Sequence, residues 1–428
     1  MSWNFSTDPE FQKELDWIDQ FVREDVEPLD LVLGPQHDID DPRFGKLVRP
    51  LQKRVQERGL WACHLGPEMG GKGFGQLKLA LINELIGRSR FGPIVFGAQA
   101  PDSGNADVLA EYGTPEQKKR YLEPLLANEV VSCFALTEPQ GGADPTMIET
   151  TAVREGGEWV INGEKWFASN ASVANFFLIM AVTDPEERPH RRSSMFIVPA
   201  DAPGIEVIRN YGVYGHLPTH AHMRWTNVRV PAENLLGKQG DGFIVAQQRL
   251  GGGRMHHAMR TIALAQSALD KMCERAVSRS TKGELLGDKQ LVQAQIADSW
   301  AQLRQFRLLV LETAWLADNG HSWKDLRRNV AAVKFLMPQV LHDIASRALQ
   351  VHGSLGLTDQ MPFAGMIMTA YHMGLADGPT EVHKILAARE VLKGVQPAKG
   401  MFPDYMLYEK QAAAEAKFGE ALKAVGAE

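Results

Sequence analysis

The spacing of apolar residues changes twice along this chain, and that change limits the folds it can adopt. From residue 8 to about 128, apolar residues recur at three- and four-residue steps. Between about 130 and 236 they alternate with polar residues, and from Gly242 onward the longer steps return. The first spacing is typical of amphipathic helices and the second of strands. We therefore predict a mainly α protein with a central β domain.

The first region, residues 1–130, carries two helix start signals. Asp8 precedes Pro9, which matches an N-cap followed by the proline favoured in a first turn. Thr114-Pro115-Glu116-Gln117 predicts a capping box at the start of a later helix. One buried helix stripe is expected to contain Phe11, Leu15, Ile18, Val22 and Val26.

The second region, residues 131–238, is rich in strand and turn signals. Gly156-Gly157 between two alternating stretches predicts a hairpin, and Asn162-Gly163 predicts a second tight turn. Roughly seven short strands in this region favour a small barrel or sandwich. Further strands are expected at 176–182, 194–198, 205–208 and 223–230.

The third region, residues 239–400, is predicted to be a four-helix bundle. Its helices are expected at 242–279, 289–319, 322–351 and 380–394, the third of them bent near Pro338. Residues 401–428 form a tail with a short alanine-rich helix.

Composition argues against several classes of protein. The net charge is −6 and the basic residues are scattered, so nucleic-acid binding has little support. No apolar run reaches membrane-spanning length. Cys63, Cys133 and Cys273 lie far apart, as expected of reduced thiols, and the histidines lack partners at metal-ligand spacing. We expect a cytoplasmic protein that binds no metal, nucleic acid or membrane.

The segment 134–144, Phe-Ala-Leu-Thr-Glu-Pro-Gln-Gly-Gly-Ala-Asp, is the strongest local signal of a binding site. An apolar strand runs into Thr137 and then into a loop of proline and glycine. Such a loop lets backbone amides approach a flat, polar-edged ligand closely. Taken alone, the same pattern also fits a plain turn.

The order of helical, β and helical regions, with Phe-Ala-Leu-Thr-Glu-Pro at the first boundary, resembles the acyl-CoA dehydrogenase family from about residue 8 to 395. The resemblance implies that FAD is the cofactor. It places the Thr137 hydroxyl and nearby amides against the flavin ring, with Phe134 and Leu136 lining its side. Gly142 is expected to face the pyrophosphate or the acyl-CoA.

Lys165-Trp166-Phe167-Ala168-Ser169-Asn170 resembles the second flavin motif of the family. The resemblance implies that Trp166 packs on the flavin ring and that Ser169 lies near a phosphate oxygen. Ala168 and Ala143 stand where hydroxyl residues are common in relatives. Ala143 is expected to border the substrate.

Two later motifs resemble those that reach the FAD of a neighbouring subunit. The first begins at Arg279 and includes Thr281, with Gln290 beyond it; the second runs from Gln350 through Gly353. An arginine fork combined with glycine-rich amides suits a pyrophosphate. The resemblance therefore implies a homodimer, or a dimer of dimers as a homotetramer.

The segment 375–383 resembles the family's catalytic turn, where most relatives carry Tyr-Glu-Gly-Thr with glutamate as the base. Asp377 takes that place here and would remove the α-proton of a thioester, while FAD accepts a hydride from the β carbon. Burial is expected to raise the pKa of Asp377 and strengthen the base. Thr380 is expected to contact FAD. On spacing alone, Asp377-Gly378 also fits an ordinary turn, and the two interpretations are compatible.

Neighbouring residues have alternative interpretations. Arg254 can steer the pantetheine, pair with Asp377, or form a structural ion pair on its helix. The three glycines between Leu250 and Arg254 leave space for an acyl chain or ease helix packing. Leu250 and Gly378 are expected to border the substrate.

Three functions are consistent with these observations. The first is an FAD-dependent acyl-CoA dehydrogenase that forms 2-enoyl-CoA in fatty acid β-oxidation and passes electrons to electron-transfer flavoprotein. The second is an acyl-CoA oxidase, which the shorter length and the lack of an extra C-terminal domain disfavour. The third is a flavin-free binding protein on the same scaffold.

Overall fold

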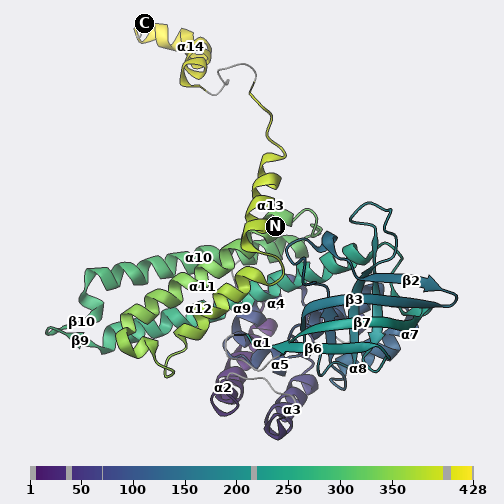
Figure 1. Cartoon of the computed structure of the whole chain (residues 1–428). Coiled ribbons are helices and arrows are strands. Elements are labelled where there is room, and N and C mark those ends of the chain that lie inside the picture. Colours follow the sequence, from purple (N-terminus) through teal and green to yellow (C-terminus); the bar gives the residue numbers. More distant parts are fainter. Residues whose placement is uncertain (1–5, 35–40, 70, 214–218, 399–405, 427–428) are drawn as a thin grey trace.

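The computed structural model describes residues 6–34, 41–69, 71–213, 219–398 and 406–426. A cluster of short helices, a β-sheet and a bundle of long helices lie side by side, and the long helix α9 runs between them (Figure 1). Within the described residues, no helix has the length and apolar character needed to cross a bilayer.

Two of the N-terminal helices begin at the caps that the sequence predicts. The Asp8 side chain accepts the backbone N–H of Phe11 at 2.9 Å, and Thr114 and Gln117 form the expected capping box. The predicted apolar stripe is buried throughout. The helices are α1 Pro9–Phe21, the π-helical Val22–Val26, α2 Glu27–Val32, α3 Pro42–Glu57, α4 Gly75–Ile86, α5 Gly92–Val95, α6 Asp102–Tyr112, α7 Pro115–Gln117, the π-helical Lys118–Leu122 and α8 Glu123–Leu126.

The central strands form one eight-stranded sheet with the order β6-β7-β3-β2-β4-β5-β8, and β1 pairs in parallel with β4. The hairpin predicted at Gly156-Gly157 joins β2 to β3. The strands are β1 Ser132–Ala135, β2 Thr151–Glu155, β3 Glu158–Ser169, β4 Phe176–Val182, β5 Ser193–Pro199, β6 Ile205–Tyr211, β7 His220–Pro231 and β8 Leu235–Leu236.

The tight turn predicted at Asn162-Gly163 is wrong. These residues lie inside β3, where the pairing with β7 shifts register. Gly163 has a φ of +150°, and a Cβ there would lie 2.5 Å from Thr150 Oγ1. The glycine therefore allows β3 to pass close to Thr150, and the chain does not reverse direction there.

The C-terminal bundle differs from the prediction in one helix. Its long members are α9 Gly242–Ser278, α10 Gln290–Asp318 and α11 Arg327–His352, which continues through Pro338. A helix that was not predicted, α12 Phe363–Leu375, packs beside α11. The expected fourth helix is α13 Thr380–Leu392, which follows α12 after a short turn.

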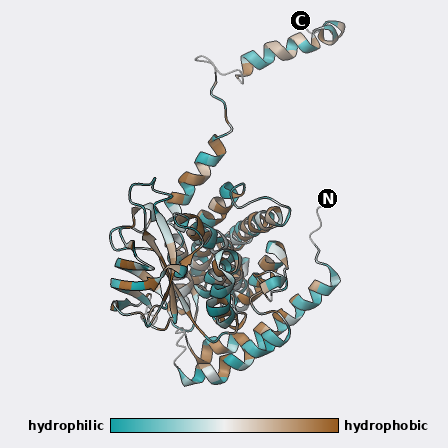
Figure 2. Cartoon of the chain, turned by 90° about the vertical axis from the view of Figure 1, so that its right-hand side faces the viewer, coloured by the Kyte–Doolittle hydropathy of each residue, from teal (hydrophilic) through white to brown (hydrophobic). Residues whose placement is uncertain are grey.

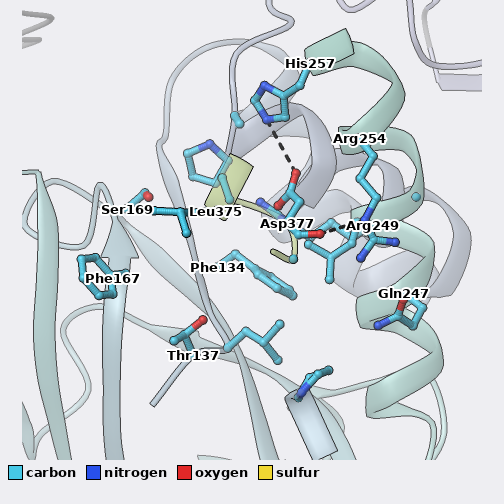
Figure 3. Close-up of a pocket in the computed structure, with 18 of the residues that line it drawn as sticks. Phe134, Thr137, Phe167, Ser169, Gln247, Arg249, Arg254, His257, Leu375 and Asp377 are labelled. Atoms are coloured by element: carbon cyan, nitrogen blue, oxygen red, sulfur yellow. Dashed lines mark hydrogen bonds and ion pairs between the residues drawn. The ribbon is translucent and has the colours of Figure 1, made fainter. Parts of the chain in front are cut away.

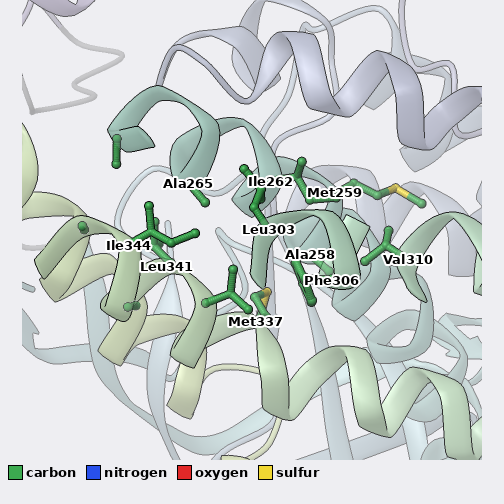
Figure 4. Packing of buried hydrophobic residues seen from close by; sticks show 14 of the residues in the cluster. Ala258, Met259, Ile262, Ala265, Leu303, Phe306, Val310, Met337, Leu341 and Ile344 are labelled. Carbon is green, nitrogen blue, oxygen red and sulfur yellow. The ribbon is translucent and has the colours of Figure 1, made fainter. Parts of the chain in front are cut away.

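Side chains from three long helices meet in the bundle core (Figure 4). Met259 and Ile262 of α9 pack with Leu303 and Phe306 of α10 and with Met337 of α11. This burial fixes α9, which also packs on α4 and α6. Helix α9 thus packs against both the bundle and the N-terminal helices and fixes their relative position.

The last helix, α14 Leu407–Ala424, stands apart from the rest of the chain (Figures 1 and 2). None of its residues is buried. Hydrophilic and hydrophobic residues alternate along it (Figure 2).

A buried ion pair holds the loop that follows β1. Lys165 Nζ lies 2.7 Å from Glu138 Oε1 and also donates to the carbonyl of Leu136, and both charged side chains are almost fully buried. Glu138 accepts the backbone N–H groups of Glu149 and Thr150 as well. Burial lowers the pKa of Lys165 to about 8, against the opposing effect of Glu138. The pair therefore ties β1, its loop and β3 together.

Replacing Lys165 with methionine should destabilise the protein by about 3–5 kcal/mol, because the carboxylate of Glu138 would remain buried without its cation. Urea unfolding measures this change, and Lys119→Met, which removes an exposed lysine, is the control. The double variant Lys165→Met with Glu138→Gln should recover part of the loss. Equal stability of Lys165→Met and Lys119→Met would contradict the prediction.

Candidate active site

A cavity of about 2180 Å³ opens between the sheet, α9 and the turn that joins α12 to α13. Pockets for one small ligand usually measure about 300–1,000 Å³, so this cavity has room for two. Its wall brings together segments that are far apart in sequence.

Most of the predicted site residues line this cavity. They are Phe134, Leu136, Thr137, Gly142, Ala143, Trp166, Ser169, Leu250, Arg254, Asp377 and Gly378.

The remaining predicted residues do not line the cavity of their own chain. Arg279 and Thr281 lie at the hairpin of β9 Ser280–Thr281 and β10 Glu284–Leu285, at the far end of the bundle (Figure 1). Gln290 begins α10, and Gln350 and Gly353 lie at the end of α11. Thr380 begins α13, and its hydroxyl donates to the carbonyl of Gly374 at 3.1 Å. The expected cofactor contact by Thr380 stays a prediction.

The sheet side of the cavity presents hydroxyl groups and flat rings. Within the described residues, the hydroxyls of Thr137 and Ser169 have no hydrogen-bond partner, and Trp166 Nε1 is buried without an acceptor. The backbone N–H of Trp166 donates to the carbonyl of Thr137 at 2.7 Å, which holds the two motifs side by side. This wall can receive a planar ligand with polar edges.

Phe167 is a lining residue that the sequence analysis missed. Its ring stacks on that of Trp166 with centroids 5.0 Å apart, and 48% of the residue is exposed. Neighbouring strand residues normally point to opposite faces. Here β3 shifts register between Lys165 and Ala168, and Phe167 has a φ of +54°, so both aromatic residues line the cavity.

The turn after α12 is held in a conformation that few sequences allow. Asp377 has a φ of +56° and Gly378 a φ of +104°. The carbonyl of Asp377 accepts the Nε–H of Arg254 at 2.9 Å and lies 3.3 Å from His383 Nε2. Arg254 thus contacts the backbone of Asp377 and not its carboxylate, which corrects the pairing considered from the sequence.

The carboxylate of Asp377 points toward the cavity and is 17% exposed (Figure 3). His257 Nε2 lies 3.7 Å from its Oδ2, too far for a hydrogen bond but close enough for a strong electrostatic effect. A Cβ at Gly253 would lie 3.2 Å from the same oxygen. The missing side chain at position 253 therefore leaves space beside the carboxylate.

The expected rise in the pKa of Asp377 is wrong. Burial by itself raises this pKa, but the electrostatic interaction with His257 and the positive charges of Arg249, Arg254 and Lys334 outweigh it and hold the pKa below its usual value. The carboxylate is therefore ionised across the neutral range. Burial also lowers the pKa of His257 to about 3 and that of Lys334 to about 8.

A second carboxylate near the glycines of α9 was not foreseen. Asp107 of α6 would lie 3.6 Å from a Cβ placed at Gly252. Burial raises the pKa of Asp107 to about 7, although Arg249 opposes the rise. In the part of the chain that the structure describes, no group of three or more His, Cys, Asp or Glu residues could hold a metal ion.

Sequence comparison identifies the class to which this fold and site belong. Models of the N-terminal, middle and C-terminal domains of acyl-CoA dehydrogenases match residues 9–129, 133–228 and 240–392. The chain therefore belongs to the acyl-CoA dehydrogenase family and is an enzyme of this class.

Individual relatives agree with this assignment. A probable acyl-CoA dehydrogenase FadE2 of Mycobacterium tuberculosis is 38% identical over 84% of this chain and 91% of its own. Acyl-CoA dehydrogenase family member 11 of Mus musculus is 37% identical over 89% of this chain, which spans half of that protein. The structure of a putative acyl-CoA dehydrogenase from Mycobacterium abscessus has a TM-score of 0.82 at 35% identity, covering 91% of this chain and 99% of that one.

FAD is the cofactor of this family, and the residues present fit it. The hydroxyl of Thr137 would suit a polar edge of the flavin ring and that of Ser169 a phosphate oxygen, and the side chains of Trp166 and Phe167 present flat apolar surfaces. A Cβ at Gly142 would touch only the Thr137 methyl, at 3.5 Å, so the loop also leaves room for a ligand.

Gly378→Ala should destabilise the catalytic turn. Alanine disfavours a φ of +104°, and its Cβ would lie 2.8 Å from His383 Nε2. We expect a loss of about 1–3 kcal/mol in thermal or urea unfolding. Gly394→Ala is the control, because no atom lies within 4 Å of its added Cβ and its φ is not positive. Equal stability of the two variants would contradict this account of the turn.

Proposed function

We propose that this protein catalyses α,β-dehydrogenation of an acyl-CoA thioester to the 2-enoyl-CoA, with Asp377 as the base. One observation carries the proposal: an ionised carboxylate, held by a strained turn, faces a cavity whose opposite wall carries the flavin motifs. Membership of the family supports the reaction class.

Asp377 would take the α-proton onto a carboxylate oxygen. Its side chain is mostly shielded from solvent, which limits proton exchange with water. The nearby cations keep it ionised and therefore able to accept the proton at neutral pH. FAD, when bound, supplies the acceptor for the β-hydride, which no side chain can provide.

The same turn also offers a donor for the thioester oxygen. Within the described residues, the backbone N–H of Asp377 donates to no acceptor. A fixed N–H that faces developing negative charge lowers the barrier to proton removal. Arg254 holds the carbonyl of this residue, so it would position both the carboxylate and the N–H.

We also propose that the active site is completed by a second copy of the chain. Arg279, Thr281 and Gln290 lie at the end of the bundle, away from the cavity of their own chain. If these residues bind FAD as the family motifs imply, the FAD must belong to a neighbour. This supports a homodimer or homotetramer, which light scattering of the holoprotein would measure.

The electron acceptor distinguishes the proposed dehydrogenase from its alternatives. We propose electron-transfer flavoprotein. The test reduces the flavin with acyl-CoA without oxygen and then admits air or adds that partner. Fast peroxide formation in air would favour an oxidase, and protein that takes up no FAD would favour a binding protein.

Asp377→Asn should bind FAD and acyl-CoA normally but bleach the flavin more slowly by about 10²–10⁴-fold, because the amide cannot accept the α-proton. Anaerobic stopped-flow absorbance measures the rate, and a ligand-induced change in the flavin spectrum measures binding. Asp107→Asn is the matched comparison, since it removes the other carboxylate near the α9 glycines. Normal bleaching by Asp377→Asn with loss in Asp107→Asn would transfer the role to Asp107.

Arg254→Gln should move the acid limb of the bleaching rate to higher pH. The positive charge of Arg254 helps to lower the pKa of Asp377, so its removal raises that pKa, and the carboxylate is protonated at a less acidic pH. Rates measured across the acid range, with FAD content as a check, test this shift. An unchanged acid limb would show that Arg254 does not tune the base.

A further inference from the structure

Arg249 lines the cavity, and the proposed chemistry uses it only as one of the positive charges that keep Asp377 ionised. It lies on α9, four residues before Gly253, which corresponds to about 6 Å along the helix. Figure 3 shows it on the same side of the cavity as Asp377 and Arg254. It therefore lies near the base.

The Arg249 side chain is fixed in place by neutral neighbours. Its Nε–H donates to Asn105 Oδ1 at 2.9 Å, and its guanidinium carbon lies 4.0 Å from the centre of the Phe134 ring. A Cβ at Gly104 would lie 3.1 Å from Arg249 Cγ, so the glycine makes room for this conformation. Among the described residues, its two terminal nitrogens have no hydrogen-bond acceptor and no carboxylate at ion-pairing distance.

The arginines around this part of the cavity donate to neutral oxygens. Arg254 donates to the carbonyl of Asp377, and Arg260 to the carbonyls of His256 and Ala98. None of the three arginines forms an ion pair with a described carboxylate. Burial lowers the pKa of Arg260 to about 10, although the charge of Asp377 opposes the change.

Three buried carboxylates, those of Asp377, Asp107 and Asp102, lie close enough to act on Arg249, but none lies at ion-pairing distance from it. Burial raises the pKa of Asp107 to about 7, so part of its negative charge is lost at neutral pH. Asp377 has to serve the proton transfer, and Asp102 accepts the backbone N–H and the hydroxyl of Ser132. Buried cations without a paired anion are unfavourable, and a bound anion would remove part of that cost. An anionic ligand would supply it.

The helix also leaves space for such a ligand. Gly251 has no atom within 4 Å of an added Cβ, and the nearest atoms to Gly252 and Gly253 are carboxylate oxygens. Gly251 therefore leaves open space in the cavity wall, whereas Gly252 faces Asp107 and Gly253 faces Asp377.

We propose that Arg249 binds an anionic oxygen group, a carboxylate or a phosphate ester, carried by the acyl chain of the substrate. A guanidinium fork matches both groups, because two parallel N–H donors face two oxygens. This inference rests on the proposed function and specifies its substrate: an acyl-CoA whose acyl part is negatively charged, not a plain fatty acyl group.

The experiment compares thioesters in matched pairs. Succinyl-, glutaryl- and adipyl-CoA are each paired with the neutral butyryl-, pentanoyl- or hexanoyl-CoA, and a hydroxyhexanoyl-CoA is paired with its phosphate ester. For the wild type, Arg249→Gln and Arg249→Lys, anaerobic flavin bleaching gives kcat/KM and spectral titration gives Kd. Arg120→Gln is the control, since Arg120 also lies over an aromatic ring, that of Tyr121, but outside the cavity.

We expect the wild type to favour the charged member of at least one pair by about tenfold or more. Removing Arg249 also removes one cation that lowers the pKa of Asp377, so rates are compared above the acid limb of each variant. There, Arg249→Gln should lower the charged-to-neutral ratio of kcat/KM within that pair by about 10- to 100-fold. The carboxylate and phosphate pairs identify which anion is preferred. Arg249→Lys should keep part of the preference, because the charge remains but the fork is lost.

Other outcomes would overturn the inference. Bleaching by neutral thioesters alone, or equal losses for both members of a pair in Arg249→Gln, would remove the anion site while leaving the dehydrogenase intact. Loss of FAD with equal losses would assign Arg249 to the cofactor. If Arg249→Gln does not fold, Arg249→Lys decides, and an unchanged charged-to-neutral ratio would refute the site. If no thioester bleaches the flavin, the proposed function itself fails.

Discussion

The hydrogen bond from Arg254 to the carbonyl of Asp377 connects the helical bundle to the turn that carries the proposed base. It joins α9, whose position is fixed by the bundle core, to a turn of high backbone energy after α12. Without this contact the positive φ at Asp377 would lack support from the neighbouring helix. The location of the carboxylate therefore depends on packing that extends through the whole bundle.

The sheet side of the cavity is positioned by a different interaction, a buried ion pair. The buried pair of Lys165 and Glu138 joins β3 to the loop after β1, so that Thr137 and Trp166 lie side by side. A buried ion pair contributes little net stability, but it strongly disfavours arrangements that separate its partners. One wall is thus positioned by apolar helix packing and the other by charge, and the cavity lies where they meet.

Sequence patterns predicted those elements whose signals are local. The caps at Asp8 and Thr114 and the hairpin at Gly156-Gly157 depend on residues a few positions apart. Helix α12 was missed because Phe363–Leu375 is apolar almost throughout, with no polar face to reveal a helical period. The turn predicted at Asn162-Gly163 is absent because the glycine is needed there for its close approach to Thr150, which is a neighbour in space and not in sequence.

In the candidate site, too, the sequence predicts residues that stand in short motifs but not those placed by contacts between distant segments. Asp377, Thr137 and Ser169 stand in recognisable motifs, so a resemblance could nominate them. Phe167 reaches the cavity through a register shift, and the surroundings of Arg249 come from α6, β1 and α9 together, so no short pattern shows either. The direction of the Asp377 pKa shift likewise depends on cations from two separate helices.

The missing side chain at Gly253 makes two distant positions interdependent. Because the oxygen of Asp377 lies where a Cβ at position 253 would almost touch it, neither position can change size independently of the other. A longer acid at 377 would press its carboxylate toward α9, and any larger residue at 253 would force the shorter acid away. Across homologues, these two sites should therefore vary as a pair.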